Sequence, residues 1–169
     1  MDSKTSEQQE DLSTTSVFWD NYQKAGEEGR GASWWDSPVI MAHCQRLITG
    51  DAQMNVYQFL KKCLQGRLLE KGMSICSGSG EFERSMIDNG LCRQIDAWEL
   101  SDARVKEGRE MAEKGYYDIR FYQKDVNQAI FKPDHYDIFF AWSALHHIEN
   151  LEGVISNARK CLKKSGVLV

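Results

Sequence analysis

The stretch GMSICSGSGEFERSM, Gly72–Met86, joins a short apolar run to a cluster of small residues and then to a helical pattern. The run MSIC is typical of a buried strand, and EFERSMIDNG predicts a helix that ends at Gly90. Gly78 and Gly80 stand where the strand turns into the helix. Glycine there permits a positive φ and lets a ligand approach the backbone closely. An ordinary tight turn has the same pattern, so the residues that follow must decide between the two.

Those residues argue against two common ligands of glycine loops. A phosphate-binding Walker loop needs a Lys-Ser/Thr pair after the glycines, whereas Glu81 and Phe82 follow here. A dinucleotide fold requires a third glycine near position 83, which is Glu83, and this acidic side chain would repel a pyrophosphate. A cationic or neutral nucleoside is the better match.

Strand and helix patterns alternate along the rest of the chain. Further strands are expected at 94–100, 118–123, 136–142 and from 166 onward, and further helices at 101–115 and 150–166. This alternation predicts an α/β fold with a doubly wound, mostly parallel Rossmann-like sheet of about five strands. Ligands of such sheets bind at the carboxyl ends of the strands.

The first part of the chain has a different character. Residues 1–15 are polar and predict a disordered tail. Residues 16–66 predict helices: a short amphipathic one at 16–28, one from Pro38 to Gly50 with Ser37 as its cap, and one from Asp51 to near Gly66. We therefore expect an N-terminal helical region at 16–66, followed by the α/β domain at 67–169.

Composition excludes several functional classes. The 169 residues carry a net charge of −4 with mixed signs, so no electrostatic footprint for nucleic acid is expected. No apolar run is long enough for a membrane span, and the N-terminus has no signal-peptide pattern. The 5 cysteines are widely spaced without a CxxC pair, which argues against a metal site or a disulfide framework. Free thiols fit a reducing cytoplasm.

Polar residues lie at or just after the ends of three of the predicted strands. Glu99 can accept hydrogen bonds from both ribose hydroxyls of NAD or S-adenosylmethionine, although a solvated acid at a strand end is equally compatible. Asp125 and Val126 suit an adenine pocket, whereas a turn or helix-capping Asp is the alternative. His146 and His147 follow the strand at 136–142 and are candidates for a general base, or for support of the next helix.

These elements, in this order, resemble the class I S-adenosylmethionine-dependent methyltransferases over about Gly72–Val169. MSICSGSGEF, IDAWELS and QKDVN are similar to the family's first motif, second motif and adenine-binding turn. The stretch YDIFFAWSALHHIENLEGVISNARKCLKKSGVLV is the most specific and resembles members that act on small molecules. Two residues depart from the pattern: Ser74 stands where the family usually has an acid, and Cys76 where it has its first glycine.

The resemblance implies S-adenosylmethionine as the cofactor and direct methyl transfer to an oxygen or nitrogen of a small molecule. The implied cofactor-binding residues are Cys76, Gly78 and Gly80 at the methionine and ribose, Glu99 at the ribose, Leu100, Asp125 and Val126 at the adenine, and Ala141, Trp142 and Ser143 near the sulfonium. His146 is preferred to His147 as the general base.

The N-terminal helices would then cover the substrate. Arg30, which can bind the cofactor's carboxylate, and the adjacent Trp34 and Trp35, which can contact a sulfonium by cation–π attraction, are the candidate lid residues. Alternatively the tryptophans anchor the helices on the core.

Two other functions stay open. Ser74 and Cys76 are compatible with a non-catalytic binding protein of the same fold, and a dinucleotide-dependent oxidoreductase is a weaker alternative.

The sequence stops in the fifth strand, where the family normally continues. We therefore expect a truncated form with weakened cofactor binding, in which residues 167–169 are partly exposed at a sheet edge that favours self-association.

Overall fold

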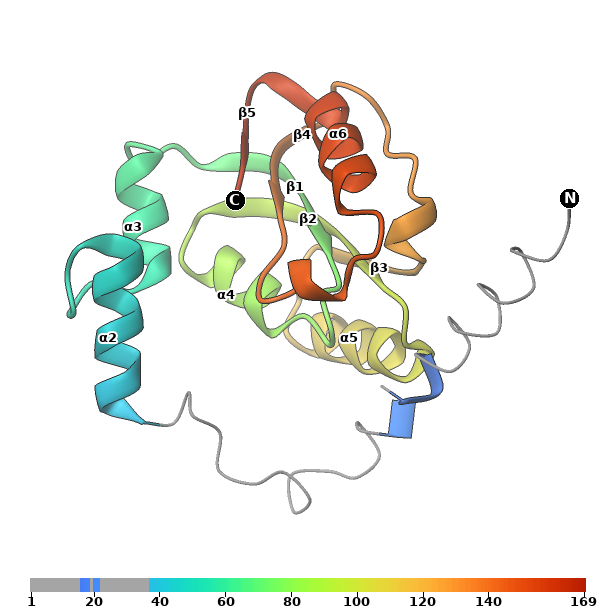
Figure 1. The fold of residues 1–169 in the computed structure, drawn as a ribbon, viewed down its shortest axis with the longest axis horizontal. Coiled ribbons are helices and arrows are strands. Elements are labelled where there is room, and N and C mark those ends of the chain that lie inside the picture. The colour runs from blue at the N-terminus through green and yellow to red at the C-terminus, as the bar shows by residue number, and fades with distance from the viewer. Residues whose placement is uncertain (1–15, 19, 22–36) are drawn as a thin grey trace, which may run out of the picture.

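The computed structural model describes residues 16–18, 20–21 and 37–169 (Figure 1). Residues 16–18 and 20–21 are helical, within the predicted N-terminal helix. The predicted tail at 1–15 and the lid candidates Arg30, Trp34 and Trp35 lie outside the described residues.

The core of the fold is a parallel sheet of 5 strands in the order β3-β2-β1-β4-β5. The strands are β1 (Leu69–Ile75), β2 (Cys92–Glu99), β3 (Ile119–Gln123), β4 (Tyr136–Phe140) and β5 (Leu162–Leu168). The chain builds outward from β1 through β2 to β3 and then returns to the other side of β1 for β4. The predicted doubly wound fold is therefore confirmed, and its topological switch point lies between β1 and β4.

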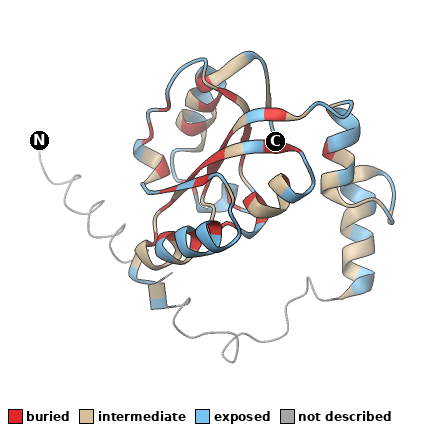
Figure 2. Cartoon of the chain, turned by 180° about the vertical axis from the view of Figure 1, so that it is seen from behind, coloured by how far each residue is buried: buried red, intermediate tan, exposed pale blue. Residues whose placement is uncertain are grey.

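Helices cover both faces of the sheet (Figure 1). They are α3 (Val56–Cys63), α4 (Glu81–Asp88), α5 (Asp102–Lys114) and α6 (Leu151–Cys161), with short 3₁₀ turns η3 (Val126–Gln128) and η4 (Leu145–His147). The α2 helix (Pro38–Thr49) packs on α3 rather than on the sheet. One apolar cluster joins α3, α4 and α5 to the sheet, and another joins α6 and η3 to the opposite face. Figure 2 shows the buried residues concentrated in the strands and on the inner sides of the helices.

Helix ends follow local capping, with two corrections to the expected bounds. The α2 helix begins at Pro38 and ends at Gly50, whose φ is 81°. The α3 helix begins at Val56 rather than Asp51, because the Asn55 side chain and the Gln58 side chain form a reciprocal capping box. The last helix ends at Cys161 rather than near residue 166, since Leu162 already pairs with Tyr136 as the start of β5.

The β5 strand is the outer edge of the described sheet. It pairs with β4 alone, and Val169 donates a backbone hydrogen bond of 2.9 Å to the carbonyl of Phe139. Leu168 and Val169 are about half exposed there, and Val167 is partly buried. Among the described residues, no helix is long and apolar enough to cross a membrane.

Candidate functional site

The glycine loop between β1 and α4 adopts an unusual backbone. Cys76, Gly78 and Gly80 have φ values of 51°, 56° and 82°. A Cβ placed on Gly80 would lie 2.4 Å from the Cζ atom of Phe121, so this position requires glycine for its conformation and for its space. The loop is also tied to β2, because the Ser77 amide donates a 3.1 Å hydrogen bond to the carbonyl of Trp98.

Cys76 occupies a left-handed conformation that glycine adopts without strain. A residue with a Cβ pays roughly 1–2 kcal/mol for it. Burial, reinforced by the carboxylates of Glu99 and Asp125, raises the pKa of the Cys76 thiol to about 12. The thiol therefore stays protonated and is no nucleophile. Because both carboxylates act on this thiol, Glu99 and Asp125 face the same loop.

Glu99, at the carboxyl end of β2, is buried and holds the glycine loop. Its Oε2 accepts a 2.8 Å hydrogen bond from the amide of Gly78, and its Oε1 accepts one of 2.9 Å from the amide of Ser101. The alternative of a solvated acid at a strand end is therefore wrong. Each carboxylate oxygen keeps a second lone pair, which is available to a ribose hydroxyl.

Asp125, after β3, combines a turn role with a free oxygen. Its Oδ1 accepts hydrogen bonds from the amide and the side chain of Asn127, at 2.9 and 3.1 Å. Its Oδ2 is enclosed, and no hydrogen-bond partner for it exists among residues 37–169 or the few described residues before them. An unpaired buried oxygen costs about 1–3 kcal/mol, and a donor such as the exocyclic amine of adenine would satisfy it. Val126 is buried directly beside it.

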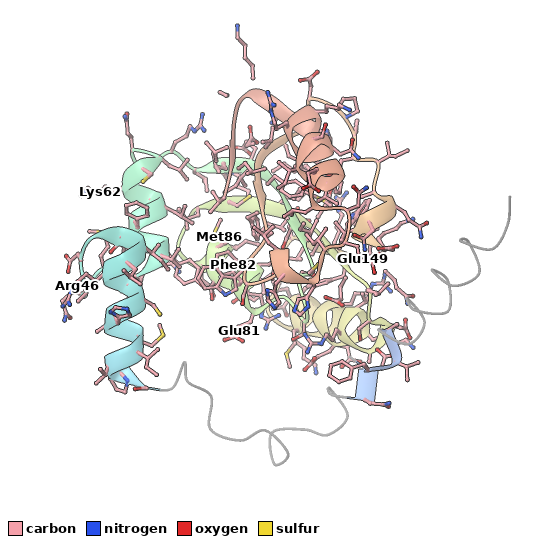
Figure 3. All side chains as sticks on the ribbon, viewed as in Figure 1. Arg46, Lys62, Glu81, Phe82, Met86 and Glu149 are labelled. Atoms are coloured by element: carbon pink, nitrogen blue, oxygen red, sulfur yellow. The ribbon has the colours of Figure 1, made fainter. Side chains whose placement is uncertain are left out.

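The loop after β4 carries an aromatic stack. The strand ends at Phe140, so Ala141 and Trp142 lie beyond it rather than within it. The Trp142 ring stacks on Phe82, with centroids 4.4 Å apart and 12° between the planes. Phe82 also contacts Tyr57 of α3 at 5.3 Å. In Figure 3 Phe82 lies between α3 and the sheet, so the aromatic stack connects the N-terminal helices to the end of β4.

Ser143 and the two histidines complete this edge. Ser143 has a φ of 52°, and His146 and His147 lie in η4 with ring centroids 3.8 Å apart. Both histidines are exposed. Partial burial, followed by the charge of His146, lowers the pKa of His147, whereas Glu99 acts in the opposite direction. His147 is therefore within electrostatic reach of the carboxylate that holds the glycine loop.

The N-cap of the next helix, α6, is an asparagine rather than a histidine. Asn150 caps α6, because its Oδ1 accepts a 3.2 Å hydrogen bond from the amide of Gly153. The Asn127 side chain accepts hydrogen bonds from the amides of Glu149 and Asn150, at 3.0 and 3.1 Å. The segment before α6 is thus held by asparagines, and support of this helix by the imidazoles stays an alternative to a catalytic role.

Sequence reasoning missed two polar residues beside the loop. The Nη1 atom of Arg104 lies 3.1 Å from the position of a Cβ on Gly78, so its guanidinium covers the glycine loop. Asp20 accepts a hydrogen bond from the hydroxyl of Ser101 and a 3.4 Å one from the amide of Ala103. The N-terminal helical segment thus reaches the beginning of α5. No local pattern singles out either residue, since both contacts join distant parts of the chain.

Glu83 is the third residue whose role was missed. It lies in the first turn of α4 and is almost fully buried, and the hydroxyl of Ser74 in β1 donates a hydrogen bond to its Oε1. Its Oε2 has no hydrogen-bond partner within the described part of the chain. Burial raises the pKa of Glu83 to about 7, although the Ser74 hydrogen bond opposes this. The signal in the sequence is an acid three residues after Gly80, which argues against a pyrophosphate but also supplies a carboxyl beside the loop.

Within the described ranges, no group of three or more His, Cys, Asp and Glu side chains could hold a metal ion. The polar groups instead gather at the carboxyl ends of β1, β2, β3 and β4, on both sides of the switch point. This is where open α/β sheets bind their ligands.

Comparison with known proteins gives a consistent result. Residues 73–166, more than half of the chain, match a protein family described as "Methyltransferase domain". No curated protein sequence matches the chain.

Solved structures share the fold. The YcgJ protein from Bacillus subtilis is 20% identical with a TM-score of 0.58, over 66% of this chain and 47% of that one. The PH0226 protein from Pyrococcus horikoshii is 22% identical with a TM-score of 0.59, over 75% and 52%. An S-adenosylmethionine-dependent methyltransferase from Mesorhizobium loti is 19% identical with a TM-score of 0.54, over 59% and 44%.

The chain thus spans about half the length of these solved structures. The family match indicates S-adenosylmethionine as the cofactor, and the enclosed Oδ2 of Asp125 and the Glu99-braced glycine loop suit its adenosine part. The chain belongs to the methyltransferase domain family.

Proposed function

We propose that this chain binds S-adenosylmethionine and transfers its methyl group to an oxygen or nitrogen of a small molecule. The observation that carries the proposal is that two features lie at the same edge of the sheet. One is the Gly78 loop, which Glu99 holds by a hydrogen bond, and the other is the Oδ2 atom of Asp125, which has no partner among the described residues. Glu99 would receive the ribose hydroxyls, and Asp125 the exocyclic amine of adenine. Leu100 and Val126 would flank the base, and Ala141, Trp142 and Ser143 would lie near the sulfonium.

The chain's own contribution to the reaction is alignment and exclusion of water. When bound, the cofactor supplies an activated methyl group. Trp142, held by its stack on Phe82, would form a wall of the reaction site. The sequence favours His146 as the general base, whereas the lowered pKa of His147 favours a neutral imidazole at pH 7. We therefore propose that His147 accepts the acceptor's proton, with His146 as the second candidate.

The N-terminal region would cover this site. Two contacts support this proposal: Asp20 binds the start of α5, and an aromatic stack runs from Tyr57 of α3 through Phe82 to Trp142. Arg30, Trp34 and Trp35 stay candidates for the cover. Trp34→Ala should then weaken ligand binding, and a lower melting temperature with unchanged affinity would assign the residue to folding alone.

Calorimetric titration tests the cofactor. We expect S-adenosylhomocysteine to bind wild-type protein, and Asp125→Ala to weaken binding of adenosine ligands by roughly tenfold for one buried hydrogen bond. Glu149→Ala is the matched control, since this acid is exposed and the substitution keeps the backbone amide that binds Asn127. Binding of NADH in preference to S-adenosylhomocysteine would favour the oxidoreductase instead.

A non-catalytic binding protein is the second candidate. It is supported by the strained Cys76 and by Ser74, which both depart from the family pattern. Transfer of a labelled methyl group from S-adenosylmethionine into a metabolite extract separates the two. A labelled product supports the enzyme and identifies its acceptor, whereas tight cofactor binding without any labelled product supports the binding protein.

A further inference from the structure

Glu83 is an ionisable group that the proposed reaction does not use. It follows the glycine loop directly, on the first turn of α4, and its carboxyl is enclosed beside the carboxyl end of β1. The hydroxyl of Ser74 satisfies only Oε1. Oε2 stays without a partner among the described residues, so the Ser74 contact does not fully account for the acid.

Two neighbouring charges act in opposite directions on the pKa of Glu83, because Arg84 lowers it and Glu99 raises it. Glu83 takes part in none of the ion pairs between described residues. Arg84 on the same helix directs its Nη1 to the carbonyl of Ser79, at 2.6 Å. Glu99 from β2 has the same sign as Glu83. Tyr57 from α3 is uncharged at neutral pH, and burial raises its pKa further. Burying a carboxylate without a cation costs free energy, so a positively charged ligand group would stabilise the ionised form of Glu83.

S-adenosylmethionine has the required charge. Its methionyl part carries an ammonium group, and its sulfur is a sulfonium. Glu99 already accepts hydrogen bonds from two amides, whereas Glu83 has an oxygen to spare. Ser74 stands where a strand acid is expected, and its hydroxyl holds the carboxyl supplied by the neighbouring helix.

We infer that Glu83 is the residue that holds the cofactor's amino group, in place of an acid at position 74. This inference rests on the proposed function. In the ligand-free protein Glu83 is partly protonated, and binding of the ammonium group displaces that proton. The Ser74 hydroxyl acts as a positioning group that keeps Oε1 in place and leaves Oε2 for the ligand.

The test compares ligands with and without the amino group. Calorimetry at pH 7.5 measures S-adenosylhomocysteine, which has the ammonium but no sulfonium charge, and 5′-methylthioadenosine, which lacks the amino acid part. Glu83→Gln should weaken S-adenosylhomocysteine by roughly tenfold to a hundredfold, as for a lost hydrogen bond to a charged group, and leave 5′-methylthioadenosine unchanged. Glu81→Gln, an exposed acid on the same helix turn, is the matched control and should change neither.

A measurement on wild-type protein keeps the inference testable without a variant. Affinity for S-adenosylhomocysteine should be several-fold lower at pH 6 than at pH 7.5, while that for 5′-methylthioadenosine stays constant.

An equal loss of affinity for both ligands in Glu83→Gln, or no loss for either, overturns the inference and leaves the proposed function intact. Loss for S-adenosylmethionine alone also overturns it, since the acid would then sense the sulfonium. If wild-type protein binds no adenosine ligand, the proposed function fails first.

Discussion

Replacing Glu83 by Gln should make the ligand-free protein more stable above neutral pH. The folded-state pKa of about 7 lies above the ordinary 4.5, because the carboxyl is buried away from water. The folded state therefore holds a proton more tightly than the unfolded state does. The stability that this proton contributes is fully present below pH 4.5 and is lost as the pH rises through 7. The difference of about 2.5 pKa units corresponds to about 3 kcal/mol between pH 4.5 and pH 8.

Glutamine removes this proton equilibrium and keeps the side-chain shape. Urea denaturation of wild type and Glu83→Gln at pH 5, 6, 7 and 8 gives the free energy of unfolding at each pH. We expect the variant to gain stability relative to wild type with rising pH, by up to about 3 kcal/mol at pH 8, with unchanged m-values. Parallel curves for the two proteins over this range would refute the reasoning. If Glu83→Gln is more stable and also binds S-adenosylhomocysteine more weakly, the wild-type acid lowers stability in favour of ligand binding.

Three further predictions concern packing, the thiols and the histidines. Gly108→Ala should destabilise the protein by about 1 kcal/mol in a denaturation assay. The new Cβ would lie 2.6 Å from Cε1 of Phe121, and this overlap outweighs the gain in helix propensity. Adding Phe121→Leu to the variant should recover part of the lost stability, whereas a Gly108→Ala variant more stable than wild type would contradict the prediction. Iodoacetamide at pH 8 should label the exposed Cys63 of the folded protein but not Cys76, whose thiol stays protonated. Cys76 should be labelled only after unfolding, as mass spectrometry of the peptides would show. His147→Gln should lower kcat by about a hundredfold with S-adenosylhomocysteine affinity unchanged; full turnover would remove His147 from the chemistry.

Much of the site could be predicted because it depends on local sequence and on one rule of topology. Strand and helix patterns placed Glu99 at the end of one strand and Asp125 shortly after the neighbouring one. Parallel strands bring their carboxyl ends to the same edge, so these residues meet with Gly78 near the switch point. The capping box of Asn55 and Gln58 was also present in the sequence, and it would have placed the start of α3 correctly.

Other features depend on contacts between distant segments. The end of α6 at Cys161 is decided by pairing of Leu162 with β4, which overrides the helical spacing of the apolar residues. The left-handed backbone of Cys76 is imposed by the loop, whose neighbours are held to Trp98 and Glu99. The one signal in the sequence is the resemblance, because Cys76 stands where the family has a glycine.

The sequence by itself determined the order of the strands and helices, the parallel sheet and the edge at which a ligand binds, because apolar periodicity and glycine positions act over a few residues. Only the tertiary structure decided how the acids of that edge are used. Glu99 became a brace for the glycine loop, and Glu83 became a buried carboxyl with one free oxygen beside Ser74. Burial and pairing set the charge and the hydrogen-bonding capacity of a carboxyl, and both depend on segments that meet only when the sheet and its helices pack together.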